Sequence, residues 1–265
     1  MASTEPIPLM AELWFEDEPE DIDRDDLLRR VHERLPDSEI HPSAESVLVA
    51  HMRYEHTYAD GKRGPLITIL AATEKTGAQT PEPTQTYDWD DADAVLERCR
   101  RSLAVGELYG RVHPYEHRVD AFRTTLNAAV AQLRPAAVWL PHSERVIRPA
   151  ALLDDPIAAF VHVRMFDVED DPDASVMDTL GLHALGMPDF QLHFRDLEPG
   201  RVAAILYNLA AYVIERGEVI TSGHTVSGMA GDEHWRCQLE DALAGPDRLV
   251  LDVNPGDPYA AGNRP

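Results

Sequence analysis

The sequence predicts an α+β fold in which helices pack against a largely antiparallel sheet. Short apolar runs rich in β-branched and aromatic residues alternate along the chain with segments of helical period. The Asp60-Gly61 pair stands between two of these runs and is typical of a hairpin. Prolines and glycines mark the ends of the segments. Together these three observations favour helices and strands that share one layered fold.

The length of 265 residues favours two sequential sheet-and-helix halves, residues 1–150 and 151–265, packed into one compact unit. Both halves follow a strand-helix-strand order. That order is compatible with a pseudo-duplicated sheet, although no repeat is visible at the level of residues.

The first half is expected to hold five strands and three helices. The predicted strands are residues 10–15, 46–56, 65–75, 103–110 and 136–141. The predicted helices are residues 21–35, 88–102 and 115–133, of which the last has the clearest amphipathic stripe. Residues 76–86, rich in proline and threonine, predict an exposed loop, and residues 143–153 predict a short connection or helix.

The second half begins with a predicted strand at residues 156–168 and an acidic loop at 169–176. Residues 198–217 predict a helix that is apolar on almost every side and is therefore buried or covered by a neighbouring layer. The rest predicts strand, short helix and strand at residues 219–228, 234–245 and 248–256, with a tight hairpin in SGHTVSG and a polar tail after Gly256.

The charge balance is the strongest compositional signal. There are 47 acidic and 24 basic side chains, which gives a net charge of −23. Such a surface repels nucleic acids and anionic membranes, whose binding usually begins with Lys and Arg, and it attracts basic proteins. The alternative to a basic partner is that the acidic residues only keep the protein soluble. Cys99 and Cys237 have no paired spacing and no secretory signal is visible, so we expect a cytoplasmic protein.

The stretch MDTLGLHALGMPDFQLHF, Met177 to Phe194, gathers two histidines and two aspartates. We interpret it as scaffolding: apolar residues pack, Gly181 and Gly186 allow close approach or positive φ, and Asp178 and Asp189 serve turns and caps. The imidazoles and carboxylates are then expected to point in unrelated directions. The alternative is a catalytic or metal-binding set made of His183, Asp189 and His193, although their spacing matches no compact ligand motif.

A second candidate follows the predicted strand 136–141, where His142, Ser143 and Glu144 suggest an acid-base histidine beside a hydroxyl. The alternative is that Ser143 caps a short helix. In HPYEH, Pro114 argues against one helix presenting both His113 and His117, with Glu116 as the third group if they did bind a metal. No phosphate-binding glycine loop or nucleophile elbow occurs.

Aromatic residues carry two further expectations. The four tryptophans are predicted to lie in the core: Trp14, Trp89, Trp139 and Trp235. The tyrosines on predicted loops, Tyr54, Tyr58 and Tyr87, are candidates for a protein interface.

The order of features resembles a known family. The stretch MDTLGLHALGMPDFQLHF, the helix VAAILYNLAAYVIERG, then SGHTVSG and PDRLVLDVNPG are similar to the uncharacterised bacterial domain of unknown function 4261. The upstream segments WDDADAVLERCRRSLAVGELYG and FRTTLNAAVAQLRPAAVWLPHSERVI extend the resemblance to residues 89–255, and its C-terminal part is the more specific. The resemblance implies no catalytic residues.

We therefore expect a protein-binding module, immunity-like or accessory, with an acidic surface for a basic protein partner. Neither a cofactor nor a bound metal is expected. Two alternatives stay open. One is a hydrolase or metal-dependent enzyme that uses His142, Ser143 and Glu144, or the set around His183. The other is a structural subunit of a larger assembly.

Overall fold

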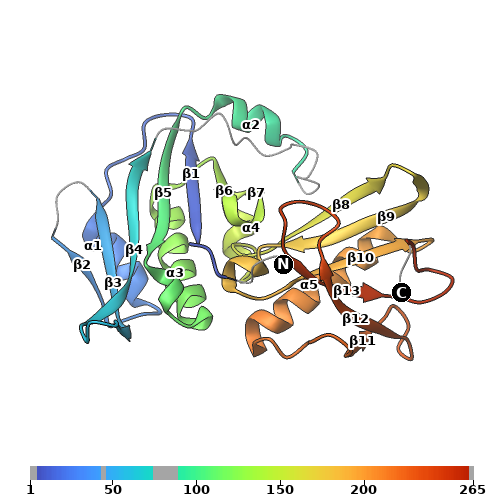
Figure 1. The fold of residues 1–265 in the computed structure, drawn as a ribbon. Helices are drawn as coiled ribbons and strands as arrows, with labels where there is room; N and C mark the ends of the chain where they lie inside the picture. The colour runs from blue at the N-terminus through green and yellow to red at the C-terminus, as the bar shows by residue number, and fades with distance from the viewer. Residues whose placement is uncertain (1–4, 43–45, 74–88, 263–265) are drawn as a thin grey trace. The chain divides into compact units, whose positions relative to one another are not determined.

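The computed structural model describes residues 5–42, 46–73 and 89–262. Within these residues, five α-helices and two largely antiparallel sheets confirm the predicted α+β fold (Figure 1). The chain divides into two compact units. The first is Pro8–Ala159, and the second combines the residues before Pro8 with the chain from Phe160 onward. The predicted loop 76–86 and Tyr87 lie outside the described residues.

The first unit is built on a seven-stranded sheet in the order β2-β3-β4-β5-β1-β6-β7, in which all neighbours are antiparallel. Its strands are β1 (Met10–Phe15), β2 (Ser38–His41), β3 (Val47–Thr57), β4 (Arg63–Thr73), β5 (Arg101–Leu108), β6 (Ala137–Leu140) and β7 (Arg145–Ile147). The five predicted strands are all present, and β2 and β7 are additional. The hairpin at Asp60-Gly61 is confirmed, because Tyr58 donates its backbone N–H to Lys62 and Gly61 has φ 79°.

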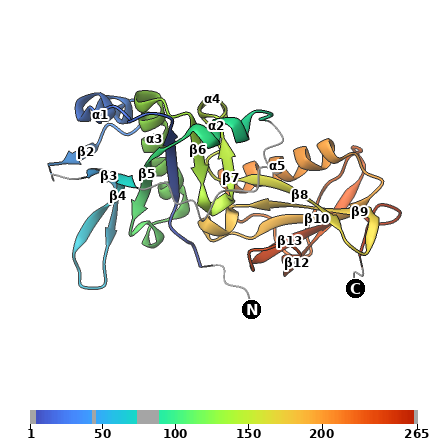
Figure 2. The same ribbon diagram turned by 90° about the horizontal axis from the view of Figure 1, so that it is seen from above.

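The helices of the first unit are α1 (Arg24–His32), α2 (Ala92–Arg98), α3 (Tyr115–Leu133) and α4 (Pro149–Asp154). The Asp23 side chain caps α1 by accepting from the backbone N–H groups of Asp25 and Asp26. Helices α1 and α3 lie side by side (Figure 2). Trp14 packs against α2 residues, and its neighbour across the sheet is Ser102. Side chains alternate between the two faces of a sheet along a strand, so Glu107 and Ser102 of β5 lie on opposite faces. Glu107 binds Arg118 of α3, on the face opposite to Trp14 and α2. Helices therefore cover both faces of this sheet.

The second unit has a six-stranded sheet in the order β11-β12-β13-β10-β9-β8. Its strands are β8 (His162–Val168), β9 (Asp171–Leu180), β10 (Asp189–Arg195), β11 (Thr225–Ser227), β12 (His234–Asp241) and β13 (Leu249–Asn254). Neighbours are antiparallel except β10 and β13, which are parallel. Helix α5 (Pro199–Arg216) packs against β8, β9 and β10, and its buried stripe is Val202, Leu206, Ala210 and Val213.

The two units share an order of elements but differ in sheet topology. Each has three consecutive antiparallel strands, a long helix and a later antiparallel pair: β3-β4-β5, α3 and β6-β7 in one, and β8-β9-β10, α5 and β12-β13 in the other. In the first unit β1 is inserted between β5 and β6. In the second unit β13, the last strand of the chain, pairs directly with β10.

Several predictions for the second unit are wrong. The predicted helix 234–245 is strand β12, because buried Trp235 and Cys237 alternate with exposed His234 and Arg236 at the period of a strand. The acidic segment predicted as a loop is mostly strand β9, and its residues Asp171 and Asp173 lie at the solvated end of that strand.

The boundaries of three other predicted segments also differ. Residues 156–161 form turns before β8 and are buried except for Pro156. The stretch SGHTVSG holds the first strand of a hairpin, not its turn. The tail is partly packed: Ala261 is buried and donates its backbone N–H to His193.

Aromatic placement follows the core prediction and corrects the interface one. All four tryptophans are buried. Tyr54 is not on a loop; it is buried in β3, and its hydroxyl donates to Asp120 at 2.6 Å. Tyr58 follows β3 and is half-buried. Cys99 and Cys237 are both buried thiols, and burial raises the pKa of Cys237 to about 11.

Candidate functional site

The set His142, Ser143 and Glu144 lies in the turn between β6 and β7. His142 is buried, and its ring nitrogens lie 3.1 Å from the carbonyl oxygen of Met10 and 2.9 Å from that of Ala159. The hydroxyl of Ser143 donates to the carbonyl of Leu140 at 3.4 Å. Ser143 does not cap a helix, because strand β7 follows it. Both ring nitrogens of His142 and the hydroxyl of Ser143 thus face backbone carbonyl oxygens.

The HPYEH pair behaves as the proline predicts. His113 precedes Pro114, and helix α3 begins only at Tyr115, so His113 and His117 do not share a helix. His113 is buried, and neither of its ring nitrogens has a hydrogen-bond partner within the part of the chain that the structure describes. Glu116 is exposed in the first turn of α3.

The stretch Met177–Phe194 forms the end of β9, a 3₁₀ turn at Leu182–Leu185 and strand β10. Its packing residues are all buried: Met177, Leu180, Leu182, Leu185 and Met187. Gly181 and Gly186 have φ values of 133° and 87°, so the prediction of positive φ at these glycines is confirmed.

Asp178, His183 and Asp189 of this stretch converge, so the expectation of unrelated directions is wrong for these three side chains. Arg164 on β8 stands directly opposite Asp178 on β9 and binds it through two hydrogen bonds of 3.0 and 2.7 Å. Arg248 binds Asp178 and also donates to Asp189 at 3.2 Å. Asp178 is thus a fully buried strand residue between two guanidinium groups and has no turn or cap role.

Asp189 does hold the turn, as predicted, but it also orients a histidine. Its carboxylate accepts hydrogen bonds from the backbone N–H groups of Leu182 and His183 and from the Thr179 hydroxyl. The Nδ1 atom of His183 lies 3.1 Å from the same carboxylate. The His183 side chain keeps 16% of its surface exposed, whereas Asp189 has none.

We call the group Arg164, Asp178, His183, Asp189 and Arg248 the buried ion cluster. Burial raises the pKa of Asp178 above its ordinary value, although the two arginines act in the opposite direction. Burial would also raise the pKa of Asp189, but the hydrogen bond from His183 and the charge of Arg248 outweigh it and the pKa is lowered. The carboxylate of Asp189 is therefore held in its ionised form.

The buried ion cluster also anchors the chain between β12 and β13. Arg164 donates to the carbonyl of Gly245 at 2.8 Å, and Arg248 donates to the carbonyls of Ala244 and Pro246 at 2.8 and 2.9 Å. The backbone N–H of Leu243 donates to the side chain of Gln191 at 2.7 Å. Most donors and acceptors of the cluster are therefore satisfied inside the unit, which is typical of a structural network.

His193 does not join His183 and Asp189. It lies four residues beyond Asp189 on the same strand, and at about 3.3 Å per residue this is a separation of roughly 13 Å. The structure therefore assembles two of the three residues in this predicted set. Within the described residues, no group of three or more His, Cys, Asp or Glu side chains has the arrangement of a metal site.

Four of the five cluster residues fall in one segment that has relatives. Residues 178–254 match the family described as Domain of unknown function (DUF4261). The resemblance expected from the sequence is confirmed for this segment. The DUF4261 match starts at Asp178 and ends with strand β13, so it leaves out Arg164 and the whole first unit. No curated protein and no solved structure matches the chain.

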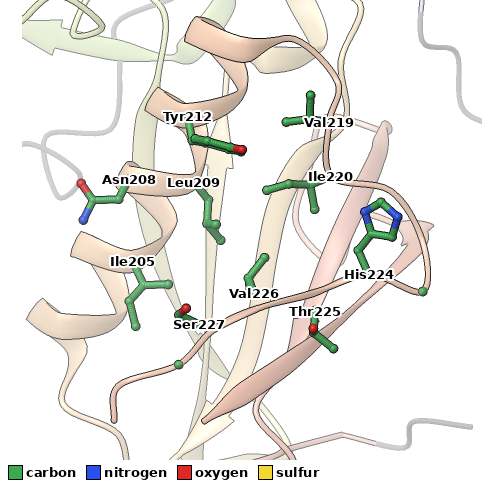
Figure 3. A pocket seen from close by; sticks show the side chains of 12 residues that line it. Ile205, Asn208, Leu209, Tyr212, Val219, Ile220, His224, Thr225, Val226 and Ser227 are labelled. Carbon is green, nitrogen blue, oxygen red and sulfur yellow. The ribbon is translucent and has the colours of Figure 1, made fainter. Parts of the chain in front are cut away.

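The DUF4261 segment also carries an open groove between helix α5 and strand β11, with a volume of about 850 Å³. Figure 3 shows Ile205, Leu209 and Tyr212 on the helix side and Ile220 and Val226 on the other. The exposed fractions of Tyr212 and Val219, which lies at one end, are 49% and 44%, high values for large apolar side chains. His224, Thr225 and Ser227 add polar groups on the strand side.

The groove corrects the prediction that α5 is buried or covered on almost every side. Only one stripe of α5 is buried, and Ile205, Leu209 and Tyr212 form a second apolar stripe at helical spacing that faces the groove. The sequence signal for this groove is a helix that is apolar on almost every side. The sheet covers only one apolar stripe of such a helix, so the second stripe stays open to another contact. The arginine partners of Asp178 left no comparable signal.

Proposed function

We propose that this chain is a protein-binding module, immunity-like or accessory, whose acidic surface meets a basic protein. The observation that carries the proposal is the net charge of −23, in a chain whose only lysines are Lys62 and Lys75. A field of this sign accelerates encounter with a cationic partner and repels anionic ones. Apolar area is also needed, since interfaces have apolar centres and polar rims, and the α5–β11 groove offers it.

Two structural features favour binding over catalysis. His142 and Ser143 are engaged with backbone carbonyls. The arginines and aspartates of the buried ion cluster pair with one another below the surface. A catalytic site needs groups that converge on a space open to substrate.

The proposal is tested by capturing partners with the tagged full-length chain from extracts of the organism that encodes it, at about 50 and about 200 mM salt. We expect a reproducible protein with positive net charge. After purification, its affinity for the chain should fall steeply with salt, because the attraction is screened over about 8–10 Å at physiological salt. Recovery of only salt-insensitive or acidic proteins contradicts the proposal.

A second candidate function rests on the contact between His183 and Asp189. A buried carboxylate that fixes Nδ1 of a partly exposed imidazole is the arrangement used to orient acid-base histidines. If His183 is such a residue, the chain should hydrolyse at least one member of a panel of chromogenic esters, amides and phosphate esters. His183→Gln should then lower that rate by roughly 10²–10⁴-fold. A panel without wild-type turnover counts against this candidate.

A further inference from the structure

The outer edge of β11 is unpaired in the part of the chain that the structure describes. Strand β11 is the last strand of its sheet, and its only neighbour is β12. In an antiparallel pair, residues alternate between those that hydrogen-bond to the neighbouring strand and those that do not. We call the set to which a residue belongs its parity. The parity of each β11 residue therefore decides which of its backbone groups are free to bind another strand.

That parity follows from the hydrogen bonds at the two ends of β11. Cys237 donates its backbone N–H to His224, and Gly228 donates its backbone N–H to Glu233. Val226, opposite Trp235, has the same parity as these pairs. Thr225 and Ser227 have the other parity, so their N–H and C=O groups point away from β12, and neither residue has a hydrogen bond among the described residues.

The free edge runs beside the α5–β11 groove, as Figure 3 shows. A strand added to β11 would present every second side chain to the groove, because side chains alternate between the faces of a sheet. Leu209 and Tyr212 on α5 would then meet apolar side chains. A small apolar ligand would fill the groove but leave the backbone groups of Thr225 and Ser227 unused.

Charge selects the kind of segment. Glu218 is exposed next to Val219 at one end of the groove, and the negative end of the α5 dipole lies at the same end. Asp232 is exposed in the turn between β11 and β12. Arg216, also at the end of α5, is paired with Glu215. A second copy of this chain is disfavoured, since each copy carries −23 charges.

We propose that the basic partner docks an extended segment along β11. The segment pairs its backbone with Thr225 and Ser227 and places alternate apolar side chains in the α5–β11 groove, with Lys or Arg at the flanking positions. This inference rests on the proposed function and specifies its binding site.

The test uses a displayed library of random 12-residue peptides selected against the full-length chain. We expect enriched peptides to carry apolar residues at alternate positions, with Lys or Arg on either side of that run. Their affinities are measured by fluorescence anisotropy against wild-type protein, Ser227→Pro, which removes an outward N–H donor, and Tyr212→Asp, which charges the groove. Each variant should weaken binding at least about tenfold, and Leu243→Asp, a change at an exposed apolar residue outside the groove, should not.

A second measurement leaves the protein unchanged. Methylating the peptide's backbone nitrogens one at a time should abolish binding at alternate positions only, which is a signature of strand pairing. Uniform tolerance of methylation, or equal affinity for the groove variants and wild type, overturns the inference while leaving a basic partner in place. Selection of no basic peptides, together with no salt-dependent partner from extracts, defeats the proposed function itself. A wild-type dimer that Tyr212→Asp dissociates makes a second copy the occupant and also overturns the inference.

Discussion

At the scale of single residues, a buried ion pair leaves no space for a side chain at Gly110. The carboxylate of Glu107 binds Arg118 and accepts the backbone N–H of Leu9, and all of this is buried. A Cβ atom at position 110 would lie 2.0 Å from Oε2 of Glu107. Any side chain there must displace the carboxylate from its partners or shift the backbone.

We therefore expect Gly110→Ala to lower the free energy of unfolding by about 1–3 kcal/mol, the usual range for overpacking. The matched control is Gly231→Ala, where a Cβ meets nothing within 4 Å, and it should be neutral or slightly stabilising. Urea denaturation of both variants measures the difference. Equal stability of Gly110→Ala and wild type would show that Glu107 can move without loss.

His113 gives a prediction about pH. Burial lowers its pKa to about 4, and the neighbouring His56, His117 and Arg118 add to the effect. Because the unfolded imidazole has a pKa near 6.5, the unfolded state binds a proton first as pH falls. Stability linked to His113 is thus complete above about pH 6.5 and is lost as pH falls toward 4, by up to about 1.4 kcal/mol per pH unit.

His113→Gln removes this proton uptake, so the variant should gain stability relative to wild type as the pH is lowered from 7 to about 4.5. Denaturant midpoints at several pH values measure the trend. His51, whose pKa burial lowers to about 4, contributes a parallel loss in both proteins and cancels in the comparison. His234→Gln, at an exposed position, serves as the control and should track wild type. Parallel profiles for His113→Gln and wild type would contradict the assignment.

At the scale of elements, the sequence pattern predicts those helices and strands whose structure depends on residues within the same segment. Helix α3 occupies the predicted residues 115–133, because its apolar stripe and the prolines that flank it act within one segment. Strand β12 lies where the sequence predicts a helix, because its alternation of buried and exposed residues covers only a few positions. The buried ion cluster was not predictable, because Arg164 and Arg248 reach Asp178 only through the register of the sheet.

The cluster supplies a prediction at this scale. Arg248→Met leaves Asp178 and Asp189 buried with one cation fewer and frees the chain between β12 and β13. Removing one partner of a buried pair costs about 3–5 kcal/mol of unfolding free energy. Arg236→Met, at an exposed arginine of β12, should change it by less than about 0.5 kcal/mol. A loss below about 1 kcal/mol for Arg248→Met would mean that the cluster contributes little to the fold.

At the scale of the whole molecule, the charge of −23 acts on stability as well as on binding. No helix among the described residues is long and apolar enough to cross a membrane. Exposed ion pairs such as Arg63 with Glu55 and Arg101 with Glu18 compensate part of the negative charge, but each such pair contributes only about 0–1 kcal/mol. The remaining carboxylates repel one another more strongly in the compact state than in the unfolded chain.

Salt weakens both the repulsion and the exposed pairs, and the excess of like charges decides which effect dominates. Raising the ionic strength from about 0.01 to about 0.15 M shortens the screening length from about 30 to about 8 Å. We expect the thermal midpoint at pH 7 to rise by several degrees, since repulsion extends over the whole surface whereas each pair acts over one contact. The same scan near pH 4.7, the sequence pI, removes the net charge, and there salt should have no effect or lower the midpoint. A midpoint that falls with salt at pH 7 would show that the ion pairs outweigh the repulsion, and would weaken the view that the surface field is strong enough to attract a basic partner.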